Sequence, residues 1–235
     1  MTRAAARRGR GAGLARPVRG MTLGAVALSF LGGLAAPLRA QLAASGTGLV
    51  SVAEHRVDAG RGVEQATGML FGGEGTLFIG ARTEIFVHAA GGKLTAVSAN
   101  ADDRDLAEVE LRAAVVPVPW LALHAAVSTR TYSTALVRER WTALRFGGEV
   151  RLAFVGAGVT GMLRAEVLPS VSVGGLEDPS RAFAAGAGLE WRVGVLALGL
   201  RYELERYDFP TVAGVDRREQ VSMLTAHAGL RLGGR

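Results

Sequence analysis

The side chains best able to do chemistry in this sequence are glutamates, arginines and histidines that recur at alternate positions. In Leu106–Val116, read as LAEVELRAAVV, Glu108, Glu110 and Arg112 fall on one side of an extended chain and aliphatic residues fall on the other. Period-two alternation is typical of a β-strand whose two faces differ. Such a polar face can form ion pairs, line a channel or hold an acid–base pair.

Similar polar residues in other segments lie at comparable positions, about four to seven residues from the nearest tight turn. A shared height on neighbouring strands predicts an interior belt of charge. We interpret this belt as a salt-bridged plug, and a polar channel or a small-solute site is the alternative. Its members are Glu74, His88, Glu110, Arg112, His124, Glu149, Arg151, Arg164, Arg201 and His227.

Two of these histidines raise the question of a metal site. His88 and His124 belong to strands separated by the one that carries Glu110 and Arg112, and a His, Glu, His set can bind a metal or transfer protons. No closely spaced ligand motif supports a metal, and Arg112 beside the site would oppose a cation. We therefore predict hydrogen-bonded histidines, no metal and no cofactor.

An enzymatic interpretation stays open beside the preferred non-catalytic one. No Gly-x-Ser-x-Gly element, phosphate-binding loop or paired-cysteine motif occurs in the sequence. The candidates for a hydrolase site are acids and a histidine expected near the rim, although loop acids are usually only solvated. They are Asp102, Asp103, Asp105, Asp208 and His55.

The N-terminus predicts export. Residues 1–20 are rich in arginine and contain no acid, and Met21–Pro37 is an apolar run too short for a membrane helix. With a small residue at Ala40, this pattern predicts a signal peptide over residues 1–40, cleaved before Gln41, and a mature domain over residues 41–235. The leader holds seven of the 27 basic residues, which leaves 20 against 21 acids, so nucleic acid is not an expected partner.

Ten segments of the mature chain alternate in this way, and no cysteine is present to cross-link them. Tight connections near residues 80, 117, 156 and 193 alternate with longer polar ones near 60, 101, 135, 177 and 213. An even number of strands places both termini on the periplasmic side of an outer-membrane barrel. The predicted strands are Gly48–His55, Gln65–Ile79, Arg82–Ser98, Leu106–Val116, Trp120–Tyr132, Arg140–Phe154, Val159–Val167, Arg181–Arg192, Leu196–Leu204 and Arg217–Leu232.

The make-up of the two faces decides between a membrane barrel and a soluble one, because both alternate. The apolar face is dominated by Leu, Val, Ala and Gly, which suit lipid better than a core that must be densely filled. The charges on the other face are of mixed sign and can pair around water. We therefore predict a charge network in the lumen, made by Glu84, His88, Glu108, Glu110, Arg112, His124, Arg130, Arg145, Glu149, Arg151, Arg164, Glu166, Arg201, Glu203 and His227.

Aromatic residues near the predicted strand ends suggest girdles at the two membrane interfaces. The residues assigned to these girdles are Trp120, Trp141, Phe154, Trp191, Tyr202 and Tyr207.

From Gly48 to Leu232 the chain resembles the small outer-membrane β-barrels of Gram-negative bacteria, on repeats such as LAEVELRAAVV and VLALGLRYELE. The resemblance implies an all-β fold, an antiparallel up-and-down transmembrane β-barrel of about ten strands, with eight or twelve as alternatives. It also implies a monomer in the outer membrane, with membrane lipid and the assembly machinery as partners.

The function expected of such a barrel is structural or that of a narrow, porin-like pore, with a charged and occluded lumen. The alternatives are an outer-membrane hydrolase with a site at the extracellular rim, and a periplasmic or secreted soluble β-barrel that binds a ligand.

Overall fold

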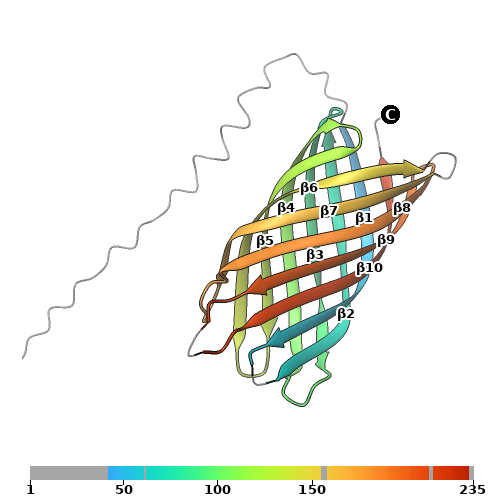
Figure 1. The fold of residues 1–235 in the computed structure, drawn as a ribbon. Coiled ribbons are helices and arrows are strands. Elements are labelled where there is room, and N and C mark those ends of the chain that lie inside the picture. The colour runs from blue at the N-terminus through green and yellow to red at the C-terminus, as the bar shows by residue number, and fades with distance from the viewer. Residues whose placement is uncertain (1–41, 61, 155–157, 212–213, 233–235) are drawn as a thin grey trace, which may run out of the picture. The chain divides into compact units, whose positions relative to one another are not determined.

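The computed structural model describes residues 42–60, 62–154, 158–211 and 214–232, which form ten β-strands (Figure 1). The predicted signal peptide, residues 1–40, and its cleavage site lie outside the described residues. The strands are β1 (Leu42–Asp58), β2 (Val63–Ile79), β3 (Thr83–Ala96), β4 (Arg104–Val118), β5 (Leu121–Ser133), β6 (Arg138–Phe154), β7 (Val159–Val173), β8 (Arg181–Val193), β9 (Leu196–Asp208) and β10 (Arg218–Leu232).

The strands close into an antiparallel up-and-down barrel. Each strand pairs with its neighbours in sequence, and β1 closes the ring by pairing with β10 from Ala44↔Leu232 to Asp58↔Arg218. The predicted ten-strand barrel is therefore confirmed. Closure leaves no sheet edge, so backbone donors and acceptors are satisfied within the wall, as a lipid environment requires.

The two ends of the barrel differ in their connections. At the turn end, where β1 begins and β10 ends, short turns such as Gly80–Arg82 and Gly194–Val195 join the strands. Gly80 and Gly194 have φ of 64° and 60°, a left-handed conformation that glycine adopts without a steric penalty. At the loop end the connections are longer, for example residues 97–103 and 209–217.

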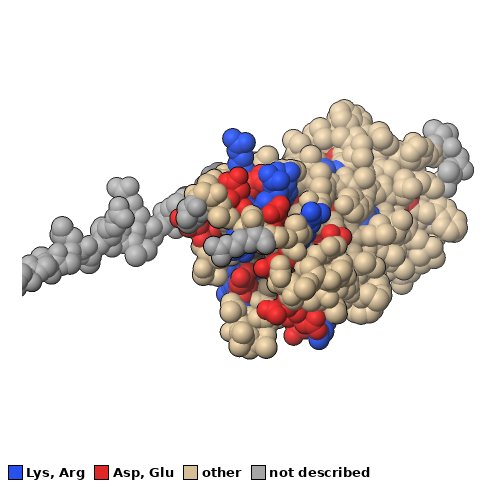
Figure 2. Space-filling model, turned by 60° about the horizontal axis from the view of Figure 1, so that its bottom comes forward, with Lys and Arg blue, Asp and Glu red and all other residues tan. Residues whose placement is uncertain are grey.

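The apolar face of every strand points outward. On β4, Leu111 is 56% exposed whereas its neighbour Glu110 is 7% exposed, and the same alternation runs around the ring. Charged side chains gather at the loop end and the flanking wall is largely free of charge (Figure 2). Because a soluble barrel has the opposite arrangement, this wall is built to face hydrocarbon. Among the described residues, no helix is long and apolar enough to cross a membrane.

Two irregularities interrupt the pairing. The β4–β5 register shifts between Val115 and Val118, where Pro117 lies, and β4 continues to Val118, past the tight connection predicted near residue 117. A second shift, between β6 and β7, lies opposite Pro169 and was not predicted. Proline cannot donate a ladder hydrogen bond, and the bulge returns Val171 to the inner face.

Two predictions need correction. The first strand begins at Leu42 rather than at Gly48, because its small-residue start pairs with both β2 and β10. Of the aromatic residues predicted for the interfacial girdles, four are exposed, namely Trp120, Phe154, Trp191 and Tyr202, and they remain candidates. The prediction is wrong for Trp141 and Tyr207, each 4% exposed. Both buried aromatics share the register of inward-facing charged residues on their strands, so they lie inside the barrel.

Candidate functional site

The predicted charge network is the candidate site. None of the residues assigned to it is exposed, and each belongs to the inward-facing register of its strand. The structure brings them into a central group, two groups that continue from it around the lumen, and a group nearer the turn end. An apolar cluster and contacts across the β1–β10 seam lie nearer the loop end.

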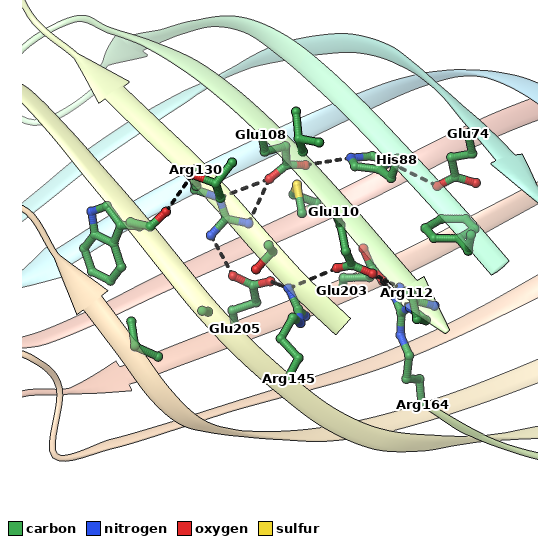
Figure 3. A pocket seen from close by; sticks show the side chains of 18 of the residues that line it. Glu74, His88, Glu108, Glu110, Arg112, Arg130, Arg145, Arg164, Glu203 and Glu205 are labelled. Carbon is green, nitrogen blue, oxygen red and sulfur yellow. Dashed lines mark hydrogen bonds and ion pairs between the residues drawn. The ribbon is translucent and has the colours of Figure 1, made fainter. Parts of the chain in front are cut away.

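The central group is built around Glu205 of β9, which sequence analysis did not assign to the network. Arg130 Nη1 donates to Glu205 Oε2 at 2.6 Å and Arg145 Nη1 donates to Glu205 Oε1 at 2.7 Å. Tyr207 donates its hydroxyl hydrogen to Glu205 Oε2 at 2.7 Å. One carboxylate thus links two arginines from β5 and β6 across the lumen (Figure 3).

A second group continues from Arg130 toward β2. Arg130 donates through Nε and Nη2 to Glu108 Oε2, at 3.0 Å and 2.9 Å. His88 lies between two carboxylates, with Nε2 3.1 Å from Glu108 Oε1 and Nδ1 3.3 Å from Glu74 Oε1 (Figure 3). Arg201 also donates to Glu74. These contacts run around the lumen from β5 through β4, β3 and β2 to β9.

Glu166 of β7 is the hub on the opposite wall. It accepts from Arg145 Nε at 2.7 Å, and His124 Nε2 lies 2.8 Å from its other oxygen. Arg164 lies 3.6 Å from Glu166 and forms its close ion pair with Glu203. Because every buried carboxylate here meets at least one cation, the desolvation of the charges is offset within the network.

The last charged group lies nearer the turn end. Arg151 donates to both oxygens of Glu84, at 2.7 Å and 2.8 Å, and to Glu149 at 2.7 Å. Arg112 pairs with Glu110 and lies over the ring of Phe86. Except for Glu110, which is 7% exposed, these side chains are partly exposed, so solvent screens their pairing more than it screens the central group.

Toward the loop end the lumen changes from charged to apolar. Trp141 meets the rings of Tyr132, Tyr207 and Phe209 edge-on at centroid separations of 6.3, 5.0 and 6.0 Å. Aliphatic side chains pack around these rings. We name the whole set the loop-end cluster, and it comprises Ala53, Ala66, Leu70, Leu94, Leu106, Tyr132, Trp141, Ala143, Leu168, Val171, Val173, Ala184, Tyr207, Phe209, Val221 and Met223.

Two buried side-chain contacts cross the seam between β1 and β10. The hydroxyls of Ser51 and Thr225 lie 2.7 Å apart, and His55 Nε2 lies 3.0 Å from Glu219 Oε2. His55 also stacks on Tyr132 at 4.4 Å, and Arg104 lies 3.1 Å from its other ring nitrogen. His55 was predicted as a rim residue, but it is 3% exposed and lies inside the wall.

The space left in the lumen is unevenly divided. In the central group it amounts to a cavity of about 40 Å³, room for a few water molecules. At the turn end lies a cavity of about 690 Å³, which we name the turn-end cavity. Both are bordered by Glu74, Phe86, Arg112, Arg164 and Arg201, so the wide cavity narrows into the small one.

The histidines do not assemble a metal centre. His88 contacts Glu74 and Glu108 while His124 contacts Glu166, so the pair does not share Glu110. Within the described ranges no group of three His, Cys, Asp or Glu side chains is arranged to hold a metal ion. His227 has Nε2 4.0 Å from Glu190, and its Nδ1 meets no partner in the described part of the chain.

Two of the four rim acids proposed for a hydrolase site, Asp103 and Asp208, are held by ion pairs. Asp103 accepts from the Ala96 backbone N–H at 2.9 Å and pairs with Lys93, and these two contacts lower the pKa of its carboxyl. Asp208 pairs with Arg206 and Arg218 at 3.1 Å and 3.0 Å. A carboxylate held in this way is a poor proton donor. The contacts give the hydrolase interpretation no support.

No protein-family model matches the chain, and no curated protein sequence matches it. Among solved structures it is similar to Neisserial surface protein A, at 11% identity and a TM-score of 0.36, over 79% of this chain and 96% of that one. It is also similar to the β domain of the Bordetella autotransporter BrkA, at 14% identity and a TM-score of 0.40, over 80% of this chain and 98% of that one. A third similar structure is the translocator domain of the autotransporter NalP from Neisseria meningitidis, at 11% identity and a TM-score of 0.42. It covers 82% of this chain and 88% of that one.

With TM-scores of 0.36 to 0.42 these likenesses are loose, and no function follows from them. What identifies the fold is the chain's own geometry. A closed antiparallel ring of ten strands, with its apolar face outward and its charges enclosed, is that of an outer-membrane β-barrel.

Proposed function

We propose that this protein is an outer-membrane barrel with an occluded lumen and a structural rather than a conducting role. The observation that carries the proposal is the position of Glu205 between Arg130 and Arg145, directly below the loop-end cluster. The three side chains are 3%, 8% and 7% exposed, and the cavity beside them is about 40 Å³. A layer with so little free space favours a lumen closed to hydrated ions.

The rings above that layer support the same interpretation. Trp141 packs against Tyr132, Tyr207 and Phe209. Charged groups meet these rings at their margins, where Tyr207 donates to Glu205 and the Arg217 guanidinium lies over Phe209. An ion that crossed the charged layer would then meet an apolar constriction, which is a barrier to conduction in its own right.

Planar-bilayer recording of the purified barrel tests the proposal. We expect no steady conductance steps from the wild type and small steps from the double variant Trp141→Ala/Tyr207→Ala, which removes two rings of the loop-end cluster. Trp191→Ala is the matched control, because that ring is 49% exposed on the outer wall. Steady steps from the wild type would contradict occlusion and establish the narrow pore instead.

We also propose that residues 1–40 are removed during export and that residues 41–235 insert as a monomer through the outer-membrane assembly machinery. Membrane fractionation and sequencing of the mature N-terminus test this. We expect the protein in the outer-membrane fraction, a sequence that begins at Gln41, and a gel band that shifts on boiling, as folded barrels do. Recovery from the soluble periplasm would contradict the proposal.

A further inference from the structure

The turn-end cavity has the size and lining of a binding site. Its volume of about 690 Å³ lies within the range of small-molecule sites, and its walls reach the turn Gly80–Arg82 and the end of β4 at Pro117–Pro119. The cavity therefore opens at the turn end of the barrel, on the side of the short connections, which is the periplasmic side of such barrels. Its floor is the charged layer around Arg112, Arg164 and Arg201.

Most arginines that border this cavity already have an acidic partner. Arg151 pairs with Glu84, Arg201 with Glu74 and Arg192 with Glu190. Two arginines at the mouth of the cavity, Arg82 and Arg231, lack such a partner. Within the described ranges no carboxylate lies within 4.0 Å of either guanidinium. The unpaired charge of the cavity is therefore positive and concentrated at its entrance.

The surroundings of Arg231 hold its guanidinium in a defined orientation. The guanidinium carbon lies 4.2 Å from the centre of the Phe78 ring, a cation–π contact between β10 and β2. Ser45 of β1 lies opposite Arg231 in the sheet and opposite Thr76 on its other side. Ser45, Thr76 and Arg231 all line the cavity, so hydroxyl groups accompany the guanidinium on one patch of wall.

We propose that the turn-end cavity binds a small solute bearing a carboxylate or phosphate group, held by Arg231 with Arg82 and the hydroxyls of Ser45 and Thr76. A guanidinium presents paired N–H donors that match an oxyanion, and stacking on Phe78 reduces the entropy lost on binding. Hydroxyl donors complete such a site. This proposal goes beyond the structural role and holds whether or not the lumen conducts.

Isothermal titration of the folded barrel in detergent, with inorganic phosphate and with citrate as separate probes, tests the site. We expect saturable binding of at least one probe. Binding of phosphate identifies a phosphate-bearing solute as the ligand class, and binding of citrate alone identifies a carboxylate. If neither phosphate nor citrate binds saturably, the proposal is overturned.

The variant Arg231→Gln removes the charge and is expected to weaken binding roughly tenfold or more, the cost of one charge-assisted hydrogen-bonded contact. Arg231→Lys, which keeps the charge, should recover part of the affinity. Arg140→Gln is the matched control, since Arg140 is an exposed arginine at the loop end of β6. Unchanged binding in Arg231→Gln, or an equal loss in Arg140→Gln, would rule out a specific site.

Each variant is first checked for the folded band on an unboiled gel. Should Arg231→Gln fail to fold, Ser45→Ala/Thr76→Ala replaces it, because both residues are partly exposed and their truncation leaves the ion pairs intact. That double variant is also expected to weaken binding. Full affinity in it, in the absence of a folded Arg231→Gln, would overturn the proposed site.

Discussion

The two halves of the barrel interior are built in opposite ways behind one continuous wall. The loop half is filled by the loop-end cluster, in which Leu70 and Leu94 are 0% exposed. The turn half is hollow, and its wall is lined by partly exposed charges around a cavity of about 690 Å³. The outward faces of the same strands show no such division, since exposed aliphatic residues continue along the wall.

This difference separates two kinds of packing along the axis of the barrel. The loop half has the dense packing of a soluble protein core, turned inward. The turn half keeps charges in contact with water, where they cost less to hold and can meet a solute. The layer around Glu205 lies between the halves and combines their properties. It is charged like the turn half and buried like the loop half.

The largest effect is expected from breaking that separating layer. Glu205→Ala leaves Arg130 and Arg145 buried without their shared partner, which should destabilise the barrel by roughly 3 to 5 kcal/mol. Glu190→Ala, the matched change in the turn half, removes a side chain whose partner Arg192 is 52% exposed, and should cost about 1 kcal/mol or less. Urea unfolding followed by tryptophan fluorescence measures both.

Equal losses in the two glutamate variants would show that burial does not distinguish the two halves. A mild Glu205→Ala phenotype would mean that water enters the central layer, and the occluded lumen would then lose its main support.

A second test compares packing in the two halves by the same kind of truncation. Leu70→Ala should cost roughly 2 to 5 kcal/mol, because the loop-end cluster cannot close over the lost volume. Met162→Ala in the turn half borders an existing cavity and should cost about 1 kcal/mol or less. The same unfolding measurement applies, and a costly Met162→Ala would mean that the turn half is more tightly packed than the structure has it.

A third test uses the absence of cysteine from the chain. A single Ala153→Cys, exposed at the mouth of the turn-end cavity, should react quickly with a water-soluble maleimide. Ala143→Cys, 6% exposed within the loop-end cluster, should react only after unfolding. Mass spectrometry of the folded protein measures both rates. Rapid labelling at residue 143 would show that water passes the cluster.

The smallest effect is expected outside the barrel interior, at the loop residue Asp103. Its pKa is lowered from the usual 3.8 by the Ala96 N–H and by Lys93, so its contribution to stability is present above that value and is lost as the pH falls below it. Asp103→Asn should therefore differ slightly from the wild type at pH 7, and the difference should shrink as the pH falls below 3.8. A difference that grows on acidification would reverse the assigned direction.

The sequence was sufficient to predict the strands and their faces wherever charges marked one side. In β4, Glu108, Glu110 and Arg112 identify the inner face without ambiguity, and nearly every strand has one such marker. The turn near Gly194 follows from glycine between two alternating runs. These features are local, with a period of two, so one strand can be read without its neighbours.

The part of the loop-end cluster on β2 was missed because that strand is apolar on both faces around Leu70. In β2 the run Met69, Leu70 and Phe71 gives no indication of which side chain points inward, and small residues surround it. Trp141 and Tyr207 could have been placed, since they share the register of Arg145 and Glu205. The expectation of an interfacial girdle outweighed that signal. The pairing of charges across the lumen, such as that of Glu205 with Arg130, could not be predicted from spacing, because it depends on the shear of the barrel.

The seam between β1 and β10 has a consequence for how the protein is made. The first strand can pair on both sides only when the last strand is present, so the contacts Ser51–Thr225 and His55–Glu219 form when the ring closes. Until then β1 and β10 each have one edge with unpaired backbone donors and acceptors, which can pair with another chain. The nascent polypeptide must therefore be kept from self-association throughout its transit, and a copy that lacks its final hairpin should be degraded rather than accumulate as a smaller ring.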